Sequence, residues 1–319
     1  MKYSIGIDLG GTKTAAGLVD ENYNIIDKTS APTKREGTSE EIANGICTLI
    51  GSLLEKNGKT HENIEKIGDA VPGAVDVSRG EVIYSCNLPF RFFPLEKALK
   101  DKLNFEKIAL ANDANAAALG EAVAGAAKNT YSSVMITLGT GVGGGVVIDG
   151  KLLIGKNGAA AELGHIVIEE NGKECSCTRR GCFEAYCGAP ALIKLTEAKL
   201  REALARGEKS AMLDEIGGDF GKITTRTAFE ASKSGDAVAL DTVREYTKYL
   251  ACGITNIINI FQPDVLTIGG GISGQGDYLL KFIVPIIERE QYTRDYKNKT
   301  EIKIATLGND AGIIGAAAL

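Results

Sequence analysis

The chain has 319 residues, 44% hydrophobic and 24% charged, and its length predicts a globular protein of two domains or lobes. The net charge is −5 and no basic run is present, which argues against a nucleic-acid-binding surface. The opening residues MKYSIGIDLG do not resemble a signal peptide, and no apolar segment is long enough to cross a bilayer. We therefore expect a cytoplasmic protein with no nucleic-acid or membrane partner.

Three short strands are predicted at the start of the chain, over residues 3–9, 14–19 and 25–29. Thr38-Ser39-Glu40-Glu41 has the spacing of a capping box and predicts a helix that begins there and ends near Gly58. Strand, glycine loop, strand, tight turn and strand recur at 133–138, 143–148 and 151–154. This recurrence, about 130 residues later, indicates an internal duplication.

The last third of the chain alternates helices with strands. An apolar stripe predicts a helix over 240–261 that ends before Pro263, followed by strands at 265–268 and 302–307. Asn309-Asp310 is expected to cap a final helix. Strands interleaved with helices, with no long linker visible, predict an α/β fold.

Three glycine-rich segments each follow a strand and are expected to turn back. Their consecutive N–H groups can converge on phosphate oxygens, and Thr12, Lys13 and Thr140 add polar donors. Ordinary tight turns also use glycine, but three such loops, two of them duplicated, favour a nucleotide site. Asp8 can hold a hydrated Mg²⁺ beside the phosphates. The segments are Asp8-Leu9-Gly10-Gly11-Thr12-Lys13, Leu138-Gly139-Thr140-Gly141-Val142-Gly143-Gly144-Gly145 and Gly269-Gly270-Gly271-Ile272-Ser273. None has the Walker A pattern or opens a dinucleotide-binding helix.

Asp113 lies where a short apolar run passes into an alanine-rich helix, at the carboxyl end of a predicted strand. Either Asn112 or Asp113 can serve there as a helix N-cap, and alone that is the simpler interpretation. Ligands of α/β proteins gather at strand ends, and an aspartate can orient an acceptor hydroxyl and take its proton. The glycine loops favour this catalytic interpretation.

His165, Cys175, Cys177 and Cys182 match the four-ligand set of a structural zinc site. The chain has seven cysteines, an odd number, which speaks for metal binding rather than for a disulfide framework. Cys187 is a competing ligand nearby. A zinc ion would fix the loop that presents Glu162 and Glu184, whose carboxylates can accept hydrogen bonds from sugar hydroxyls, although each alone is typical of a solvated surface.

The ordered set of these motifs resembles the ROK family (repressors, open reading frames and sugar kinases), in particular its glucokinase-like members. The resemblance spans nearly the whole chain. It rests on the three glycine segments and on Val71-Pro72-Gly73, Asn87-Leu88-Pro89, Asn112-Asp113-Ala114-Asn115, Glu162-Leu163-Gly164-His165 and the Cys175-to-Glu184 run. Two departures stand out: Thr178 occupies a position where glycine is usual, and Phe90 one where many relatives carry tryptophan.

The resemblance implies an actin-like, ribonuclease-H-like ATPase fold, with two lobes built on a duplicated βββαβα core. It implies a small lobe of residues 1–111 and 303–319, a large lobe of residues 112–302 with the zinc loop, and a homodimer. The implied activity is ATP-dependent phosphorylation of the 6-hydroxyl of a hexose, most simply glucose, with Asp113 as the base and Mg²⁺ as cofactor.

The resemblance also assigns binding residues. The sugar would be contacted by Gly73, Asn87, Asn112, Asp113, Glu162, His165 and Glu184. The nucleotide would be held by Asp8, Gly10, Gly11, Thr12, Lys13, Gly139, Thr140 and Gly141 on its phosphate side, and by Gly269, Gly270, Gly271 and Ile272 on its adenosine side.

Three alternatives remain at this point. The acceptor can be N-acetylmannosamine, fructose or another hexose. The chain can be a non-catalytic sugar sensor, although the first strand at Tyr3 leaves no room for the helix-turn-helix that a repressor would carry ahead of it. A partner-moving ATPase of the actin or Hsp70 type is a third possibility, and the Cys/His cluster argues against it.

Overall fold

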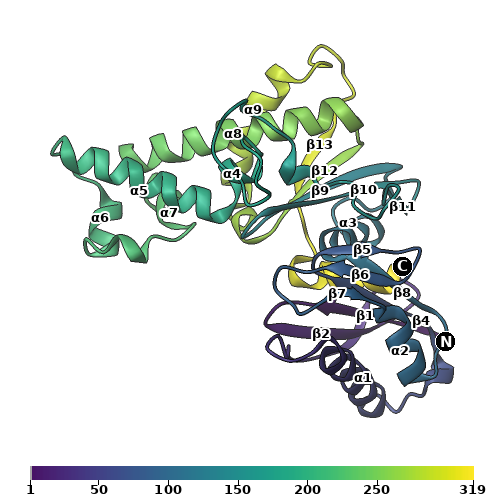
Figure 1. The fold of residues 1–319 in the computed structure, drawn as a ribbon. Coiled ribbons are helices and arrows are strands. Elements are labelled where there is room, and N and C mark those ends of the chain that lie inside the picture. The colour runs from purple at the N-terminus through teal and green to yellow at the C-terminus, as the bar shows by residue number, and fades with distance from the viewer. Residues whose placement is uncertain (1) are drawn as a thin grey trace. The chain divides into compact units, whose positions relative to one another are not determined.

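The computed structural model of the chain describes residues 2–319, which pack into two compact units (Figure 1). Unit 1 comprises the residues up to Met135, Gly144–Ala161 and Ala305–Leu319, and unit 2 comprises Ile136–Gly143 and Glu162–Ile304. These two units are defined by how the residues pack. The predicted lobe boundaries at 111/112 and 302/303 refer instead to lobes that move as wholes, and they stay a prediction.

Two five-stranded sheets share one strand order, 3-2-1-4-5 in their own sequence. The first runs β3-β2-β1-β4-β8, where β2 pairs antiparallel with β1 and β3, and β4 pairs parallel with β1 and β8. The second runs β11-β10-β9-β12-β13. The predicted duplication is therefore confirmed in topology. The strands are β1 Tyr3–Leu9, β2 Lys13–Val19, β3 Ile25–Pro32, β4 Ile64–Val71, β8 Ile108–Asn112, β9 Ser132–Leu138, β10 Val142–Ile148, β11 Lys151–Leu152, β12 Val265–Gly269 and β13 Glu301–Ile304.

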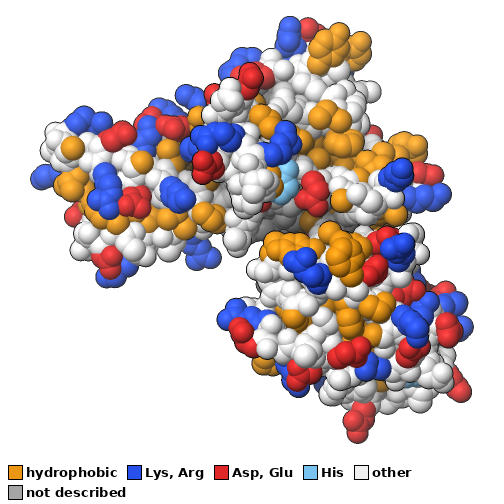
Figure 2. All heavy atoms as spheres, viewed as in Figure 1, with side chains coloured by type: hydrophobic (Ala, Val, Ile, Leu, Met, Phe, Trp, Pro, Cys, Tyr) orange, Lys and Arg blue, Asp and Glu red, His pale blue; other side chains and the backbone are white. Residues whose placement is uncertain are grey.

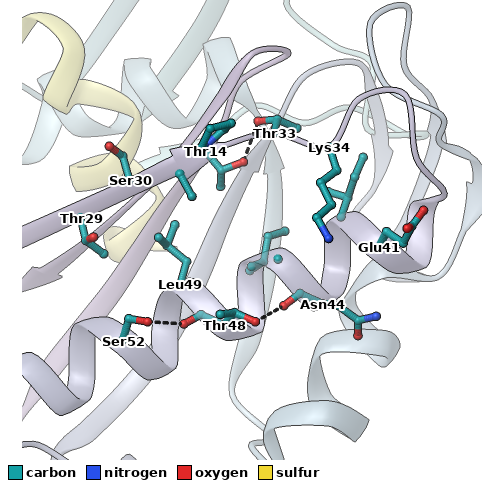
Figure 3. Close-up of a pocket in the computed structure, with 15 residues that line it drawn as sticks. Thr14, Thr29, Ser30, Thr33, Lys34, Glu41, Asn44, Thr48, Leu49 and Ser52 are labelled. Atoms are coloured by element: carbon teal, nitrogen blue, oxygen red, sulfur yellow. Dashed lines mark hydrogen bonds between the residues drawn. The ribbon is translucent and has the colours of Figure 1, made fainter.

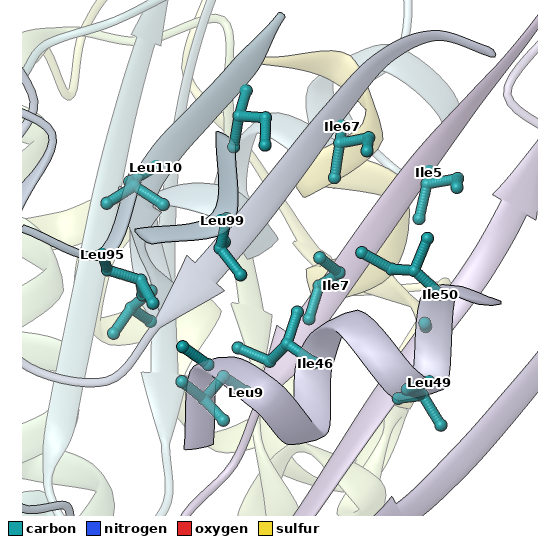
Figure 4. Packing of buried hydrophobic residues seen from close by; sticks show 14 of the residues in the cluster. Ile5, Ile7, Leu9, Ile46, Leu49, Ile50, Ile67, Leu95, Leu99 and Leu110 are labelled. Carbon is teal, nitrogen blue, oxygen red and sulfur yellow. The ribbon is translucent and has the colours of Figure 1, made fainter. Parts of the chain in front are cut away.

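Helices cover both faces of the first sheet (Figure 1). Helix α1 (Ser39–Lys56) begins with the predicted capping box, in which the Thr38 hydroxyl accepts from the N–H of Glu41 and the Glu41 carboxylate accepts from the N–H of Thr38. Together with α2 (Leu95–Leu103), α1 buries an aliphatic cluster against the sheet (Figure 4). The other face is covered by α3 (Asp113–Ala124) and α10 (Ala311–Ala318).

Helix α10 lies against the sheet backbone itself. A Cβ atom on Gly6 of β1 would collide with the carbonyl oxygen of Ile313, and one on Gly68 of β4 would collide with that of Ala316. Only glycine permits this approach, so these two positions fix the height of α10 above the strand ends.

A third, antiparallel sheet in unit 1 carries the Asn87 segment. It consists of β5 (Ala74–Asp76), β6 (Glu81–Tyr84) and β7 (Arg91–Phe93). Phe90 is buried and its ring stacks on Phe93 with 5.6 Å between centroids, so the phenylalanine that replaces the family's usual tryptophan is a core residue.

Unit 2 is built around one long helix, α8 (Ala237–Phe261), which ends before Pro263 as predicted. Tyr246 of α8 is fully buried and donates its hydroxyl to the carbonyl of Cys187 (2.9 Å). The remaining helices of this unit are α4 Glu184–Cys187, α5 Ala189–Ala205, α6 Ala211–Ile216, α7 Thr227–Lys233 and α9 Asp277–Glu290.

Several local predictions are wrong. The third glycine segment does not return as a strand but enters the 3₁₀ turn Gly271–Gln275 and then α9. Strand β11 has two residues rather than four, and β13 ends at Ile304 because the N–H of Leu307 donates to Glu121 (2.8 Å) instead of to a strand. Asp310 makes no side-chain cap on α10, since its carboxylate pairs with Lys28 (2.6 Å).

Charges of both signs are interspersed on the face shown in Figure 2, and neither forms an extended patch there. In the described part of the chain, no helix combines the length and apolarity that crossing a membrane requires.

Asp69 is an unexpected carboxyl group inside the core of unit 1. It lies on the same face of β4 as Ile67 and Val71, whose side chains belong to the aliphatic cluster, and it is completely buried. Within residues 2–319, neither of its carboxylate oxygens has a hydrogen-bond partner. Burial, and then the nearby charge of Asp8, raise the pKa of Asp69 well above its usual range.

Asp69→Val should therefore raise the free energy of unfolding by about 1–3 kcal/mol, because it removes an unsatisfied buried polar group and adds a β-branched residue to a strand. Urea unfolding measures this change. Asp69→Asn, which keeps an unsatisfied polar group, is the matched control and should gain much less. A less stable Asp69→Val protein would show that the carboxyl group has a stabilising partner.

Candidate active site and metal centre

Unit 1 brings two of the predicted site carboxylates close together. Asp8 is the second-last residue of β1, and a Cβ on Gly312, at the start of α10, would lie 2.9 Å from the Cγ atom of Asp8. Burial and then the charge of Asp113 raise the pKa of Asp8 to about 6. Partial burial also raises the pKa of Asp113, which is the first residue of α3, and the N–H of Ala114 opposes that shift. Two carboxylates in this setting favour a bound cation.

Asn112 is the cap of α3, which settles one of the two interpretations of this corner. Its side-chain oxygen accepts from the N–H groups of Ala114 (2.9 Å) and Asn115 (3.2 Å), and its amide donates to the carbonyl of Gly73 (3.0 Å). Asp113 is therefore not needed as the cap. The last of these hydrogen bonds joins Gly73 and Asn112, which are both predicted sugar contacts.

The first glycine loop is a tight hairpin between β1 and β2. Gly10 donates to the carbonyl of Lys13 (3.0 Å), and the Thr33 hydroxyl donates to the carbonyl of Gly10 (2.7 Å). A Cβ on Gly11 would lie 3.3 Å from the Cβ of Asn87, so the structure brings this predicted sugar residue against the loop. Within residues 2–319, no protein acceptor takes the N–H of Gly11, so this N–H is available to a phosphate oxygen.

The second glycine loop joins β9 to β10 in unit 2. Gly139 donates to the carbonyl of Gly141 (3.0 Å), and no protein acceptor in residues 2–319 takes the N–H of Thr140. The N–H of Val142 donates to Glu184 Oε2 (3.0 Å). A Cβ on Gly141 would collide with this same oxygen, so a larger residue there would displace the Glu184 carboxylate.

Glu184 connects this loop to the Cys/His segment. While Oε2 accepts from Val142, Oε1 accepts from the hydroxyl of Ser176 (2.7 Å). Ser176 lies between two predicted metal ligands, Cys175 and Cys177. Glu184, predicted to contact sugar, is thus also the link between the cysteine segment and the second glycine loop, a role that the sequence did not reveal.

The four predicted metal ligands converge. One ligand atom from each of His165, Cys175, Cys177 and Cys182 lies within 4.8 Å of the others. Cys175 Sγ is 3.6 Å from His165 Nδ1, and Cys177 Sγ is 3.6 Å from Cys182 Sγ. A tetrahedral ion with bonds of about 2.3 Å to sulfur places its ligands roughly 3.8 Å apart, so the donor set fits a metal of the zinc type.

Cys187, the competing ligand, is outside this group of four; its thiol is fully buried, which raises its pKa well above the usual range. Thr178 adopts the left-handed conformation (φ 70°) that the family's usual glycine adopts without strain. A β-branched residue is costly there, so the segment stores strain that the surrounding contacts must hold.

Glu162 precedes the short 3₁₀ turn Leu163–His165, and His165 is its last residue. Gly164 within it lies against the backbone of Val142, where a Cβ would collide with the carbonyl oxygen. Glu162 is exposed and the His165 ring is half-buried. This contact places both predicted sugar residues beside the exit of the second glycine loop.

The third glycine segment packs on β9. Gly270 has φ 84°, and a Cβ there would lie 2.5 Å from the carbonyl oxygen of Leu138. The Ser273 hydroxyl donates to the carbonyl of Gly270 (2.7 Å). The segment therefore lies next to the strand that leads into the second glycine loop.

The sequence and the structure both match known proteins. Residues 4–319 match the profile of the ROK family. The chain belongs to the ROK family. It is 35% identical over 315 residues to a glucokinase of Halalkalibacterium halodurans, across 98% of this chain and 93% of the relative. A crystal structure of a ROK family glucokinase from Streptomyces griseus in complex with glucose and AMPPNP superposes with a TM-score of 0.80 at 34% identity, across 99% and 98% of the two chains.

A repressor is also similar to this ROK chain. The xylose repressor of Bacillus spizizenii is 29% identical over 319 residues, which cover 99% of this chain and 76% of the repressor. Membership of the family establishes the actin-like ATPase fold, in agreement with the two equivalent sheets.

Asp8→Asn should change how stability depends on pH. The pKa of Asp8 in the folded protein, about 6, lies above the ordinary 3.8, so the folded state binds the proton more tightly than the unfolded state does. Stability should fall as the pH rises from about 4 to about 6, by up to about 3 kcal/mol, and the loss should persist above that range.

The measurement is urea unfolding in Mg²⁺-free buffer across this pH range. Asp8→Asn should make the decline smaller by up to about 3 kcal/mol, while Asp69 and Asp113, whose pKa values are also raised, keep a share of it. Asp149→Asn is the control, because Asp149 lies in an exposed turn (φ 51°) that asparagine tolerates. A decline as large in Asp8→Asn as in the unaltered protein would show that other groups carry it.

Proposed function

We propose that this chain is an ATP-dependent glucokinase that transfers the γ-phosphoryl group of ATP to the 6-hydroxyl of glucose. The supporting observation is the pair Asp8 and Asp113 beside the Gly10–Lys13 hairpin, in a chain 35% identical to a glucokinase along almost all of its length. A ROK glucokinase of the same fold has been crystallised with glucose and AMPPNP.

The proposal gives Asp113 the role of base. Its carboxylate accepts the hydrogen bond of the 6-hydroxyl and takes its proton as the hydroxyl oxygen bonds to the γ-phosphorus and the bond from phosphorus to the β-bridging oxygen of ADP breaks. Burial raises the pKa of Asp113, which makes its carboxylate a stronger base.

The two glycine hairpins are proposed to bind the phosphates. The free N–H groups of Gly11 and Thr140, with the side chains of Thr12 and Lys13, are suited to a phosphate chain. Mg²⁺, held through Asp8, would supply positive charge against the transferring group and would relieve the repulsion between Asp8 and Asp113. Gly269, Gly270, Gly271 and Ile272 are proposed for the adenosine side.

Zn²⁺ is the ion proposed for His165, Cys175, Cys177 and Cys182, because three thiolates and one imidazole form a closed tetrahedral set. Its proposed role is structural. Since His165 faces the cluster with Nδ1, its Nε2 is left for a sugar hydroxyl.

The residues proposed to contact the sugar are Gly73, Asn87, Asn112, Asp113, Glu162, His165 and Glu184. Glucose is preferred over N-acetylmannosamine or fructose because the glucokinase relatives cover the chain from end to end. We also propose that the protein is a cytoplasmic homodimer, in which each subunit closes its two lobes at the predicted boundaries. A sugar-sensing role is the second candidate, supported by the similarity to a xylose repressor.

Asp113→Asn should lower kcat by about 10²–10⁴ while the Kd for glucose changes only slightly, because the amide still accepts a hydrogen bond but takes no proton. Steady-state ADP release gives kcat, and calorimetry gives the Kd. Asp277→Asn is the matched control, since Asp277 is likewise the first residue of an α-helix. Turnover close to that of the unaltered protein would exclude Asp113 as the base.

Ser176→Ala should leave the metal content unchanged, because Ser176 is not a ligand, but should weaken AMPPNP binding about fivefold. The change removes one hydrogen bond to Glu184, worth about 1 kcal/mol, and so loosens the second glycine loop. Elemental analysis and calorimetry measure the two effects. Glu174→Gln, which breaks an exposed ion pair of the same segment, is the control. Unchanged nucleotide affinity would show that the link to Glu184 does not position the loop.

A further inference from the structure

A groove in unit 1 lies apart from the catalytic residues, between α1 and the edge strand β3 with the residues that follow it (Figure 3). Its volume is about 430 Å³, within the range of small-molecule sites. Ile42, Ile46 and Leu49 of α1 form part of its apolar floor. At Gly45, on the same helix, no atom lies within 4 Å of the position that a Cβ would take, so the groove is open beside it.

Four of the six hydroxyl groups that line the groove donate their protons to protein acceptors. Thr48 donates to the carbonyl of Asn44 (2.9 Å), and Ser52 donates to that of Thr48 (3.0 Å). The hydroxyls of Thr14 and Thr33 are 2.8 Å apart, and Thr33 donates its only proton to Gly10. Thr14 must therefore be the donor to Thr33. These hydroxyls face a ligand chiefly with lone pairs, as hydrogen-bond acceptors.

The charges around the groove are balanced. Lys34 and Glu41 are its lining residues of opposite sign, and the Glu41 carboxylate already caps α1. The walls offer these four acceptors and, from Asn44 and Lys34, also donors. Such walls, an apolar floor and no net charge suit a neutral molecule whose hydroxyl groups both donate and accept hydrogen bonds. We propose that this groove is a second ligand site, which binds a small polyol or sugar.

The groove is connected to the first glycine loop through Thr33. This lining residue donates its hydroxyl to the carbonyl of Gly10 and its N–H to the carbonyl of Thr12 (3.0 Å). A ligand that contacts Thr33 would therefore influence the position of the first glycine loop. Occupancy of the groove should therefore change the apparent KM for ATP, an effect that rests on the proposed function, whereas binding itself does not.

The probe is myo-inositol, a neutral ring with six hydroxyl donors and no primary hydroxyl, so it offers no counterpart of the proposed acceptor group. Calorimetry with about 20 mM probe detects a Kd in the millimolar range. Gly45→Leu should fill the groove and weaken binding at least tenfold. It should not impair folding, because leucine favours the helix by about 0.8–1 kcal/mol over glycine.

Gly51→Leu is the matched control, because Gly51 is also exposed on α1 with open space at its Cβ position but does not line the groove. It should bind the probe as the unaltered protein does. Thr48→Val, which removes an acceptor at constant shape, should weaken binding severalfold. The proposal is overturned if the unaltered protein binds no inositol, or if Gly45→Leu binds it equally well. Inositol binding without any sugar-dependent turnover would instead leave this site standing and count against the proposed kinase.

Discussion

The candidate catalytic corner depends on the direct contact between helix α10 and the backbone of the first sheet. Gly6 and Gly68 let the carbonyl oxygens of α10 reach the strands, where a single methyl group would force the helix away. At that height the start of α10 closes over Asp8, and its length packs along α3, whose first residue is Asp113. The raised pKa of Asp8 is the electrostatic consequence of this burial and of the nearby charge of Asp113.

In unit 2 the corresponding constraint is the carboxylate of Glu184. It accepts from the glycine loop on one side and from the cysteine segment on the other, and Gly141 leaves the space that it occupies. A metal bound by the cysteines would therefore stiffen both the glycine loop that is proposed to bind the nucleotide and the residues that are proposed to bind the sugar. The strained backbone of Thr178 shows that this segment is held by its contacts rather than by local preference.

Features encoded by neighbouring residues were predictable from the sequence. The two glycine hairpins, the capping box at Thr38 and the convergence of His165 with three cysteines all arise within short stretches of chain. Features that depend on distant partners were not. Asp310 looked like a cap but pairs with Lys28, 282 residues away in sequence.

The sequence also gave no sign that Asp69 is unsatisfied. An aspartate in an apolar strand has the same sequence pattern whether or not the fold supplies a hydrogen-bond partner. The structure shows that, within residues 2–319, both oxygens of Asp69 lack such a partner. Ser176 was missed for a related reason. The spacing of Cys175 and Cys177 identified these neighbours as ligands, whereas the hydrogen bond from Ser176 to Glu184 depends on how the segment folds back. The mutual support of Asn112 and Gly73 was hidden in the same way.

Phosphoryl transfer by this protein should depend on glucose, and the rate of ADP formation from Mg·ATP with and without sugars tests this directly. The panel consists of glucose, N-acetylmannosamine, fructose and mannose, with the metal content of the protein verified. Glucose should accelerate ADP formation by at least about 100-fold, a difference of about 2.7 kcal/mol in activation free energy, and should do so more than the other sugars. An ADP rate that no sugar changes, in metal-loaded protein that still binds AMPPNP, would contradict the assignment of this chain as a sugar kinase.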